Sequence, residues 1–258
     1  MKKHITRVIL MVWRMWFYLL TAIPILILSP ILVILVFTKN SYPGIFWIAR
    51  NIWAPFILFG SGFYLKIKYK NELPKGTSYL LVANHTSYID PFVMLRVSKN
   101  PFVFVGKKEL VRIPIFGFIY KRAAIMVDRS SSKSRWGVYE RADSVINKGL
   151  SVCIFPEKDY VDNTILLNSF KRGAFKLSID HQIPIVPMCF LDCKRKFPWH
   201  TNYGKPGKLR VETYQVISPR KRIEEMELLK EEVRGIILNG IENDPLKSNQ
   251  KAIEKEKL

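Results

Sequence analysis

The residues best suited to chemistry are His85 and Asp90, which follow the apolar run "LLVA" at residues 80–83. A histidine with a near-neutral pKa can take a proton from a hydroxyl group. It does so best when a carboxylate orients the ring and stabilises the imidazolium that forms. The pair predicts a general base that acts on a substrate hydroxyl, since Ser87, in the same turn, is an unconvincing nucleophile.

The same spacing has a simpler explanation, in which Asp90 caps a helix beside a loop histidine. Pro91 follows Asp90, as is typical of the first turn of a helix. His85 would then lie in the preceding loop, and that loop can fold the two side chains together. The spacing alone leaves both explanations open.

The elements that must position this pair alternate between strands and helices from residue 63 onward. Strands alternating with helices predict an α/β domain with a mixed, largely parallel sheet flanked by helices. Apolar runs and alternating patterns predict strands at 63–70, 78–83, 101–105, 123–127, 151–155, 183–191 and 209–217. Helical spacing of apolar residues predicts helices at about 92–98, 133–148, 171–181 and 222–240.

Polar residues follow three of these strands directly. Asn84 and His85 follow one strand, Arg129 comes soon after another, and Glu157 and Lys158 follow a third. Ligands of such folds gather beyond the carboxyl ends of the strands. We therefore expect a site at this edge of the sheet.

The first 62 residues form a separate apolar segment. The 24 residues between Arg14 and Lys39 carry no charge, and a spanning helix needs about 20. A signal peptide is the alternative, but its apolar core is about 7–15 residues and ends at a cleavage site of small residues, which is missing here. The apolar stretch at 51–64, split by Pro55, suits an interfacial or re-entrant segment. We predict a membrane-embedded helical hairpin over 1–62, with a full crossing or a buried hairpin of a soluble protein as alternatives.

Charge and cysteine usage predict where this hairpin lies. The basic flank at residues 2–14 predicts a cytoplasmic amino terminus, and a hairpin returns the rest of the chain to the same side. Cys153, Cys189 and Cys193 form no close pair, which indicates a reducing compartment. We expect a cytoplasmic (inner) membrane protein whose α/β domain, 63–244, faces the cytoplasm. The lysine-rich tail, 245–258, is predicted to be disordered.

The composition indicates an anionic partner. Lys and Arg number 41 against 21 Asp and Glu, a formal charge of +20. Aromatic residues are also abundant, and basic chains rich in aromatics suit a membrane interface. A rival reading is a non-catalytic membrane-binding protein, because each basic residue contributes about 1 kcal/mol at an anionic surface. No motif of a nucleic-acid binder is visible.

The stretch "NHTSYID", 84–90, resembles the NHx4D motif of the glycerolipid acyltransferase superfamily. Further blocks occur in the family's order, so the resemblance covers about residues 60–220. They are "GKKELVRIPIFG" (106–117), "IMVDR" (125–129), "IFPE" (154–157) and "FKRGAFKLSIDHQIPIVPM" (170–188).

The resemblance implies a reaction. His85, assisted by Asp90, would deprotonate the acceptor hydroxyl, which attacks the thioester of acyl-CoA or acyl carrier protein. The expected acceptor is the sn-2 hydroxyl of 1-acyl-glycerol-3-phosphate, and the product is phosphatidic acid. The resemblance implies no metal and no cofactor beyond the acyl donor.

The resemblance also suggests substrate-binding residues, chiefly for the phosphate. An arginine suits a phosphate because its planar fork donates two hydrogen bonds. Simpler readings are a surface ion pair for Arg129, a cap or loop salt bridge for Glu157, and solvated charge for Lys107 and the neighbouring Lys108. The candidates are Asn84, Lys107, Arg129, Glu157, Lys158 and Arg172.

One block departs from the family. The usual FPEGTRS reads "FPEKDYVDN" here, so Lys158 replaces a glycine that lets backbone approach a phosphate. Lys158, Lys171 or Arg172 could restore the positive charge. Alternatively, the acceptor lacks a phosphate, as in lyso-aminolipid acyltransferases of the same superfamily.

Overall fold

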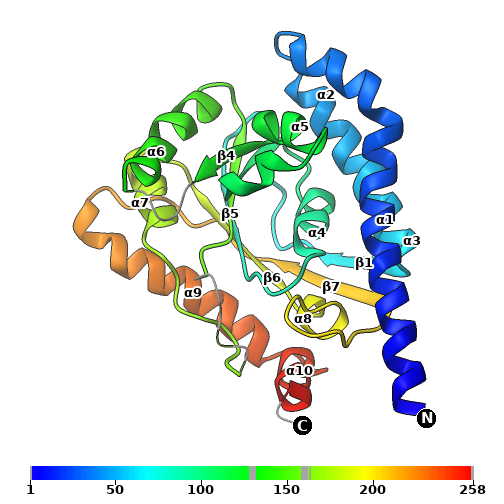
Figure 1. Cartoon of the computed structure of the whole chain (residues 1–258). Coiled ribbons are helices and arrows are strands. Elements are labelled where there is room, and N and C mark those ends of the chain that lie inside the picture. The colour runs from blue at the N-terminus through cyan, green and yellow to red at the C-terminus, as the bar shows by residue number, and fades with distance from the viewer. Residues whose placement is uncertain (1, 128–131, 158–161, 163, 257–258) are drawn as a thin grey trace.

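A computed structural model describes residues 2–127, 132–157, 162 and 164–256, and its core is a mixed sheet (Figure 1). In the described residues the sheet has seven strands in the order β1-β7-β6-β2-β5-β3-β4. Neighbours pair in parallel except β6 with β7. This confirms the predicted fold class. The strands are β1 (Phe63–Lys68), β2 (Leu80–Ala83), β3 (Phe102–Lys107), β4 (Ala124–Val127), β5 (Ser151–Ile154), β6 (Ile185–Phe190) and β7 (Gly207–Thr213).

Helices cover both faces of the sheet. Successive side chains of β2 accordingly pack into two different hydrophobic cores. Leu81 and Ala83 pack in one hydrophobic core, whereas Leu80 and Val82 pack in the other. This is the period of two of a strand buried on both faces. The first core includes residues of α1 (Lys2–Phe37), α3 (Ala54–Gly60) and α4 (Asp90–Val97). The second includes residues of α6 (Ser132–Ile146), α7 (Gly173–Asp180) and α9 (Met226–Glu242).

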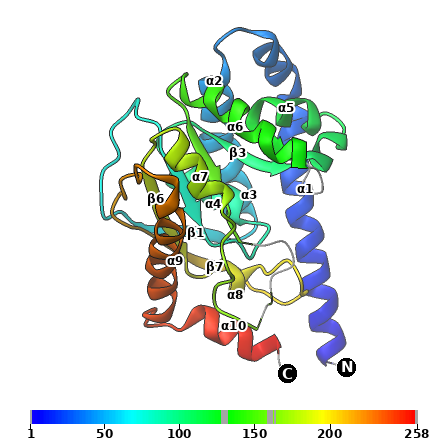
Figure 2. The same ribbon diagram turned by 90° about the vertical axis from the view of Figure 1, so that its left-hand side faces the viewer.

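The amino-terminal segment is a helical hairpin. Its first arm is α1 (Lys2–Phe37), a helix of 36 residues that includes Pro24 and Pro30. The second arm begins earlier than predicted, with α2 (Tyr42–Ile48), and continues through a π-helix (Ala49–Trp53) into α3 (Ala54–Gly60). Both arms pack on each other, and Figures 1 and 2 place α1 on the side of the molecule opposite α9.

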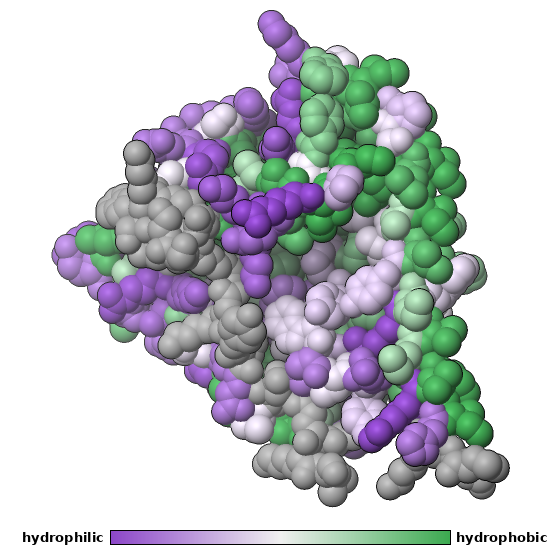
Figure 3. Space-filling model, viewed as in Figure 1, coloured by the Kyte–Doolittle hydropathy of each residue, from purple (hydrophilic) through white to green (hydrophobic). Residues whose placement is uncertain are grey.

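The outer face of α1 is apolar and exposed. Ile9, Ile27 and Ile34 are 61%, 71% and 67% exposed, and apolar side chains line this side of the molecule in Figure 3. In the described residues one helix, His4–Phe37, is long and apolar enough to cross a membrane by length and composition. An apolar surface of this extent marks contact with a membrane or another protein.

The carboxyl-terminal tail differs from the prediction. Residues Ser248–Glu256 form a helix, α10, which packs on the short helix α8 (Cys193–Lys196). Asp244 accepts hydrogen bonds from the backbone of Ser248 and, together with Asp192, from Arg210 on β7. The expectation of disorder was wrong because both polar and apolar residues of the tail are buried: Ser248 and Asn249 form hydrogen bonds, and Ala252 and Ile253 pack against the domain.

Two further helical segments follow β3 and were not predicted. They are a 3-10 helix (Lys108–Arg112) and α5 (Phe116–Ala123), and α5 packs against α1. The three cysteines are free and buried, and none is paired, as expected from their spacing. Burial raises the pKa of each thiol well above its usual value.

Candidate active site

The carboxyl end of β2 places His85 and Asp90 in direct contact. The loop at residues 84–89 folds so that Nδ1 of His85 lies 2.9 Å from Oδ2 of Asp90. The same oxygen accepts hydrogen bonds of 2.8 Å from the backbone N–H groups of Thr86 and Ser87. Because the carboxylate accepts, Nδ1 donates and the lone pair of Nε2 is left for a substrate proton. This geometry is that of an oriented general base.

The helix that follows the loop begins at Asp90 itself. Ile89 occupies the cap position, and Pro91 lies in the first turn. The Asp90 side chain is fully buried, whereas that of His85 is 27% exposed. The carboxylate therefore turns back into the loop, where it orients the histidine, and capping alone does not account for the spacing.

Two aromatic rings that the motif does not include flank the His85 imidazole. Phe155, after β5, stacks on it with centroids 4.2 Å apart and an interplanar angle of 18°. Trp199, after α8, meets it nearly edge to face at 4.5 Å and 78°. Phe155 belongs to the recognised block "IFPE", but no pattern in the sequence links Trp199 to the site.

Glu157 connects the loop at residues 84–89 to the loop that contains Asn168. Its Oε1 accepts a 2.7 Å hydrogen bond from the backbone N–H of His85. Its Oε2 accepts from the backbone N–H of Asn168 at 3.1 Å. Burial raises the pKa of the Glu157 carboxyl, and these hydrogen bonds oppose the rise. Glu157 thus positions the loop that contains His85. Its role is therefore neither that of a helix cap nor that of a loop salt bridge.

Asn84 joins the same loop to the neighbouring strand β6. Its Nδ2 donates to the carbonyl oxygen of Phe190 at 3.1 Å, and its Oδ1 accepts from the N–H of Phe190 at 2.7 Å. The side chain is buried, and both of its polar atoms contact backbone. Asn84 was predicted to bind substrate, and in the structure it holds the end of β2 against β6.

The remaining predicted residues lie apart from the pair or outside the described residues. Lys107 ends β3 and is exposed. Arg172 precedes α7 and forms a 2.5 Å ion pair with Glu227 on α9. Arg129 and Lys158 lie outside the described residues. The structure brings together Asn84, His85, Asp90 and Glu157, all at the carboxyl ends of adjacent strands.

A cavity of about 550 Å³ adjoins the loop at residues 84–89. Phe155 and Glu157 line it and also contact His85. Its apolar wall comes from β3, β4, β5 and α6, and Lys171 and Lys176 add positive charge. Within the described residues, no cluster of His, Cys, Asp or Glu could hold a metal ion.

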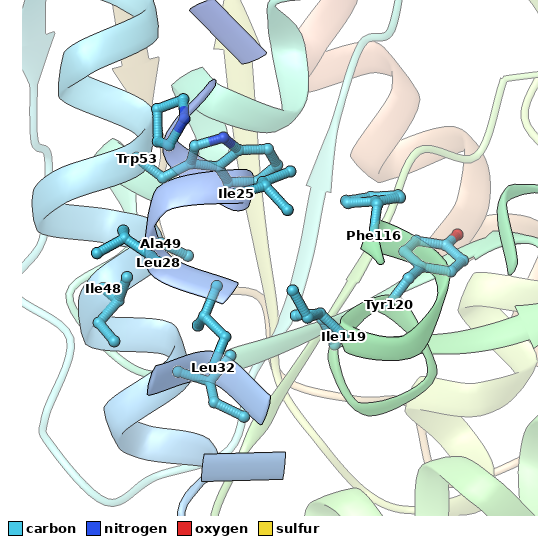
Figure 4. Close-up of a pocket in the computed structure, with 12 residues that line it drawn as sticks. Ile25, Leu28, Leu32, Ile48, Ala49, Trp53, Phe116, Ile119 and Tyr120 are labelled. Atoms are coloured by element: carbon cyan, nitrogen blue, oxygen red, sulfur yellow. The ribbon is translucent and has the colours of Figure 1, made fainter. Parts of the chain in front are cut away.

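A smaller pocket of about 70 Å³ lies between the hairpin and α5 (Figure 4). Its lining, which includes Ile25, Leu28 and Phe116, has no charged side chain. It is therefore unsuited to acid–base chemistry, which leaves the cavity beside His85 as the candidate site.

A mixed α/β sheet that presents an oriented histidine at its carboxyl edge is suited to an enzyme that uses general-base catalysis, and sequence comparison specifies the family. Residues 65–191, about half of the chain, match the family model described as Acyltransferase, so the chain contains an acyltransferase-family domain.

Relatives and a solved structure agree with this assignment. The chain is 32% identical over 143 residues to the 1-acyl-sn-glycerol-3-phosphate acyltransferase of Cocos nucifera, covering 55% of this chain and 46% of that one. It is 24% identical over 186 residues to the protein of the same name from Borreliella burgdorferi, covering 70% and 73%. The crystal structure of the 1-acyl-sn-glycerophosphate (LPA) acyltransferase PlsC from Thermotoga maritima shares the fold. Its TM-score is 0.76 at 18% identity, with 94% of this chain and 97% of that chain covered.

These matches are partial. The chain spans about half the length of the first curated relatives it matches, with 46%, 56% and 50% of their chains covered. The comparison therefore shows the family and the fold.

Proposed function

We propose that this chain transfers a fatty acyl group from a thioester, acyl-CoA or acyl carrier protein, to the sn-2 hydroxyl of 1-acyl-glycerol-3-phosphate. The product is phosphatidic acid. The observation that carries the proposal is the 2.9 Å contact between Nδ1 of His85 and the buried carboxylate of Asp90 at a partly open edge of the sheet. The names of the curated relatives support the acceptor.

The reaction uses the lone pair of His85 Nε2. It takes the proton of the acceptor hydroxyl as that oxygen attacks the thioester carbonyl, and a carbon–oxygen bond forms. The carbon–sulfur bond then breaks, and the leaving thiolate receives the proton from Nε2. Asp90 stabilises the imidazolium between these steps, because its charge is buried beside the ring.

The surroundings of the pair suit a lipid acceptor with a phosphate. Lys171 and Lys176 line the adjoining cavity, and cations beside an apolar wall suit a phosphate and an acyl chain. The exposed apolar face of α1 supports membrane association. The basic flank at residues 2–14 and the unpaired cysteines support placing the α/β domain on the cytoplasmic side. A non-catalytic membrane protein would need no buried carboxylate oriented on a histidine.

A second acceptor is favoured by the altered block "FPEKDYVDN" at residues 155–163. Replacing the glycine of this block by Lys158 changes the residues that meet the acceptor head group. A lyso-aminolipid without a phosphate is the alternative acceptor, and the reaction at His85 is the same for both.

The test is acyl transfer by the purified protein in lipid vesicles, with labelled acyl-CoA or acyl carrier protein and a panel of lysolipids. We expect the wild type to acylate lysophosphatidate, and His85→Ala to lose transfer while it stays bound to the vesicles. His181→Ala is the matched control, because His181 forms a similar contact of 3.2 Å with Asp143 away from the site. Wild-type rates in His85→Ala would refute the mechanism, and acylation of a phosphate-free lysolipid alone would refute the acceptor.

A further inference from the structure

The segment at residues 197–204, here called the strap, runs between α8 and β7 and covers the catalytic histidine. Its Trp199 ring lies 4.5 Å from the His85 ring on one side, and Phe155 stacks at 4.2 Å. Trp199 is itself partly buried. The imidazole is thus enclosed by two large apolar rings that limit the approach of water.

The strap is held from two directions. On the membrane side, Arg14 of α1 donates hydrogen bonds to the carbonyl oxygens of Pro198 at 2.7 Å and Tyr203 at 3.0 Å. The guanidinium also lies 4.5 Å over the ring of Phe197. On the catalytic side, Ser87 Oγ donates to the carbonyl oxygen of Phe197, and Ser87 forms a β-bridge with Pro198.

Arg14 is unusual for a residue of an apolar helix, since only 7% of it is exposed. A buried guanidinium is costly unless its hydrogen bonds are satisfied. Here strap carbonyl groups accept two of those bonds. The contact therefore couples α1, through the strap, to the position of Trp199.

Further aromatic rings continue from the strap to the exposed face of the hairpin. The ring of Tyr88 lies 6.3 Å from Trp199, and that of Tyr18 on α1 lies 6.2 Å from Tyr88. Tyr18 and Tyr88 are 51% and 44% exposed. Amphipathic rings are favoured at the headgroup level of a bilayer. This series of ring contacts links Trp199 to the exposed face of the hairpin.

We propose that Trp199 is a positioning residue that excludes water from His85, and that Arg14 holds it there from the membrane helix. The inference rests on the proposed acyl transfer. Water that reaches Nε2 replaces the lipid hydroxyl: its oxygen attacks the thioester carbonyl, and the carbon–sulfur bond breaks. The thiolate takes the proton through His85, and free fatty acid and thiol result. Trp199 of the strap thus determines whether the acyl group reaches lipid or water.

The decisive measurement is the ratio of ester to free fatty acid formed from one labelled acyl thioester in vesicles with lysophosphatidate. We expect Trp199→Ala to lower this ratio on the order of tenfold. Trp199→Phe should restore most of it, and Arg14→Met should give an intermediate loss. Trp47→Ala is the matched control, because Trp47 is 58% exposed on α2. An unchanged ratio in folded Trp199→Ala, or an equal fall in the Trp47 control, would overturn the inference.

A second measurement does not depend on the reaction. Diethyl pyrocarbonate modifies accessible histidines, and peptide mass spectrometry gives the rate at each one. We expect Trp199→Ala, or Trp199→Leu if the alanine variant does not fold, to speed modification of His85 several-fold, with the exposed His4 unchanged. Equal rates of His85 modification in the wild type and the variant would refute the shielding role of Trp199, even if acyl transfer is confirmed. Absence of ester with every acceptor would instead refute the proposed function.

Discussion

Replacing Asp90 by asparagine separates the charge of this carboxylate from its geometry. The backbone N–H groups of Thr86 and Ser87 both point at Oδ2. An asparagine must therefore turn its carbonyl oxygen toward them, since its NH2 group would face two donors. That oxygen also accepts from Nδ1 of His85, so the tautomer and ring orientation are kept. At these three contacts only the negative charge is lost.

The size of the effect follows from Coulomb's law. A unit charge about 4 Å from the imidazolium is worth about 4 kcal/mol at an effective dielectric constant of about 20. The imidazolium forms during the reaction, so this loss raises the barrier and lowers kcat on the order of 10³-fold. The new amide nitrogen takes the place of Oδ1, a buried atom without a hydrogen-bond partner among the described residues. We expect it to cost about 1–3 kcal/mol of folding stability.

The assay is acyl transfer in vesicles at saturating acyl donor and lysophosphatidate, with thermal unfolding measured on the same preparations. We expect Asp90→Asn to remain folded and bound, with KM little changed and kcat strongly reduced. Asp90→Ala is the comparison, since it leaves three donors without their acceptor and should unfold at a lower temperature. A kcat of Asp90→Asn within about tenfold of the wild type would show that the charge does not stabilise the imidazolium.

Three other changes test the loop that holds His85, the carboxyl-terminal tail and the membrane-facing helix. Glu157→Gln places an NH2 group against one of two backbone donors, so we expect kcat to fall on the order of 10–100-fold from a misplaced histidine loop, while KM for the donor changes little. Arg210→Met leaves its two aspartate partners buried without a cation and should destabilise the fold by about 3–5 kcal/mol in thermal unfolding. Burial raises the pKa of the Asp192 and Asp244 carboxyls, but hydrogen bonds from Arg210 outweigh it, so both pKa values are lowered. The stabilising contribution of these carboxylates is therefore complete above about pH 4 and is lost as the pH falls further. The methionine variant should lose this acid dependence. Aspartate at both Ile27 and Ile34 should move the protein from vesicles into solution, because each buried charge costs about 2.5–3.5 kcal/mol in a bilayer; continued flotation would exclude lipid contact at this face.

The sequence determines the alternation of elements because burial leaves a period in the apolar residues. The four residues of β2 are buried on both faces and form an unbroken apolar run. The catalytic pair is equally local, since His85 and Asp90 are separated by one short loop. Local chain geometry can bring such residues together, and the motif could therefore be interpreted before the fold was known.

Contacts between distant segments were decided only by the tertiary structure. Arg172 was predicted to face a phosphate, but the packing of α7 beside α9 pairs it with Glu227. The tail after Asp244 was misjudged because its position depends on contacts with distant segments, such as that of Asp244 with Arg210, 34 residues away, which composition does not reveal.

By itself, the sequence determined the fold class, the apolar hairpin and the base with its carboxylate, because periodicity, length and short spacing are local properties. Which residues enclose that base depends on segments such as α1 and the strap, 184 residues apart at the contact of Arg14 with Pro198. No local pattern encodes such a contact, since it exists only once the sheet has brought its connecting loops to one edge and the hairpin has packed against them.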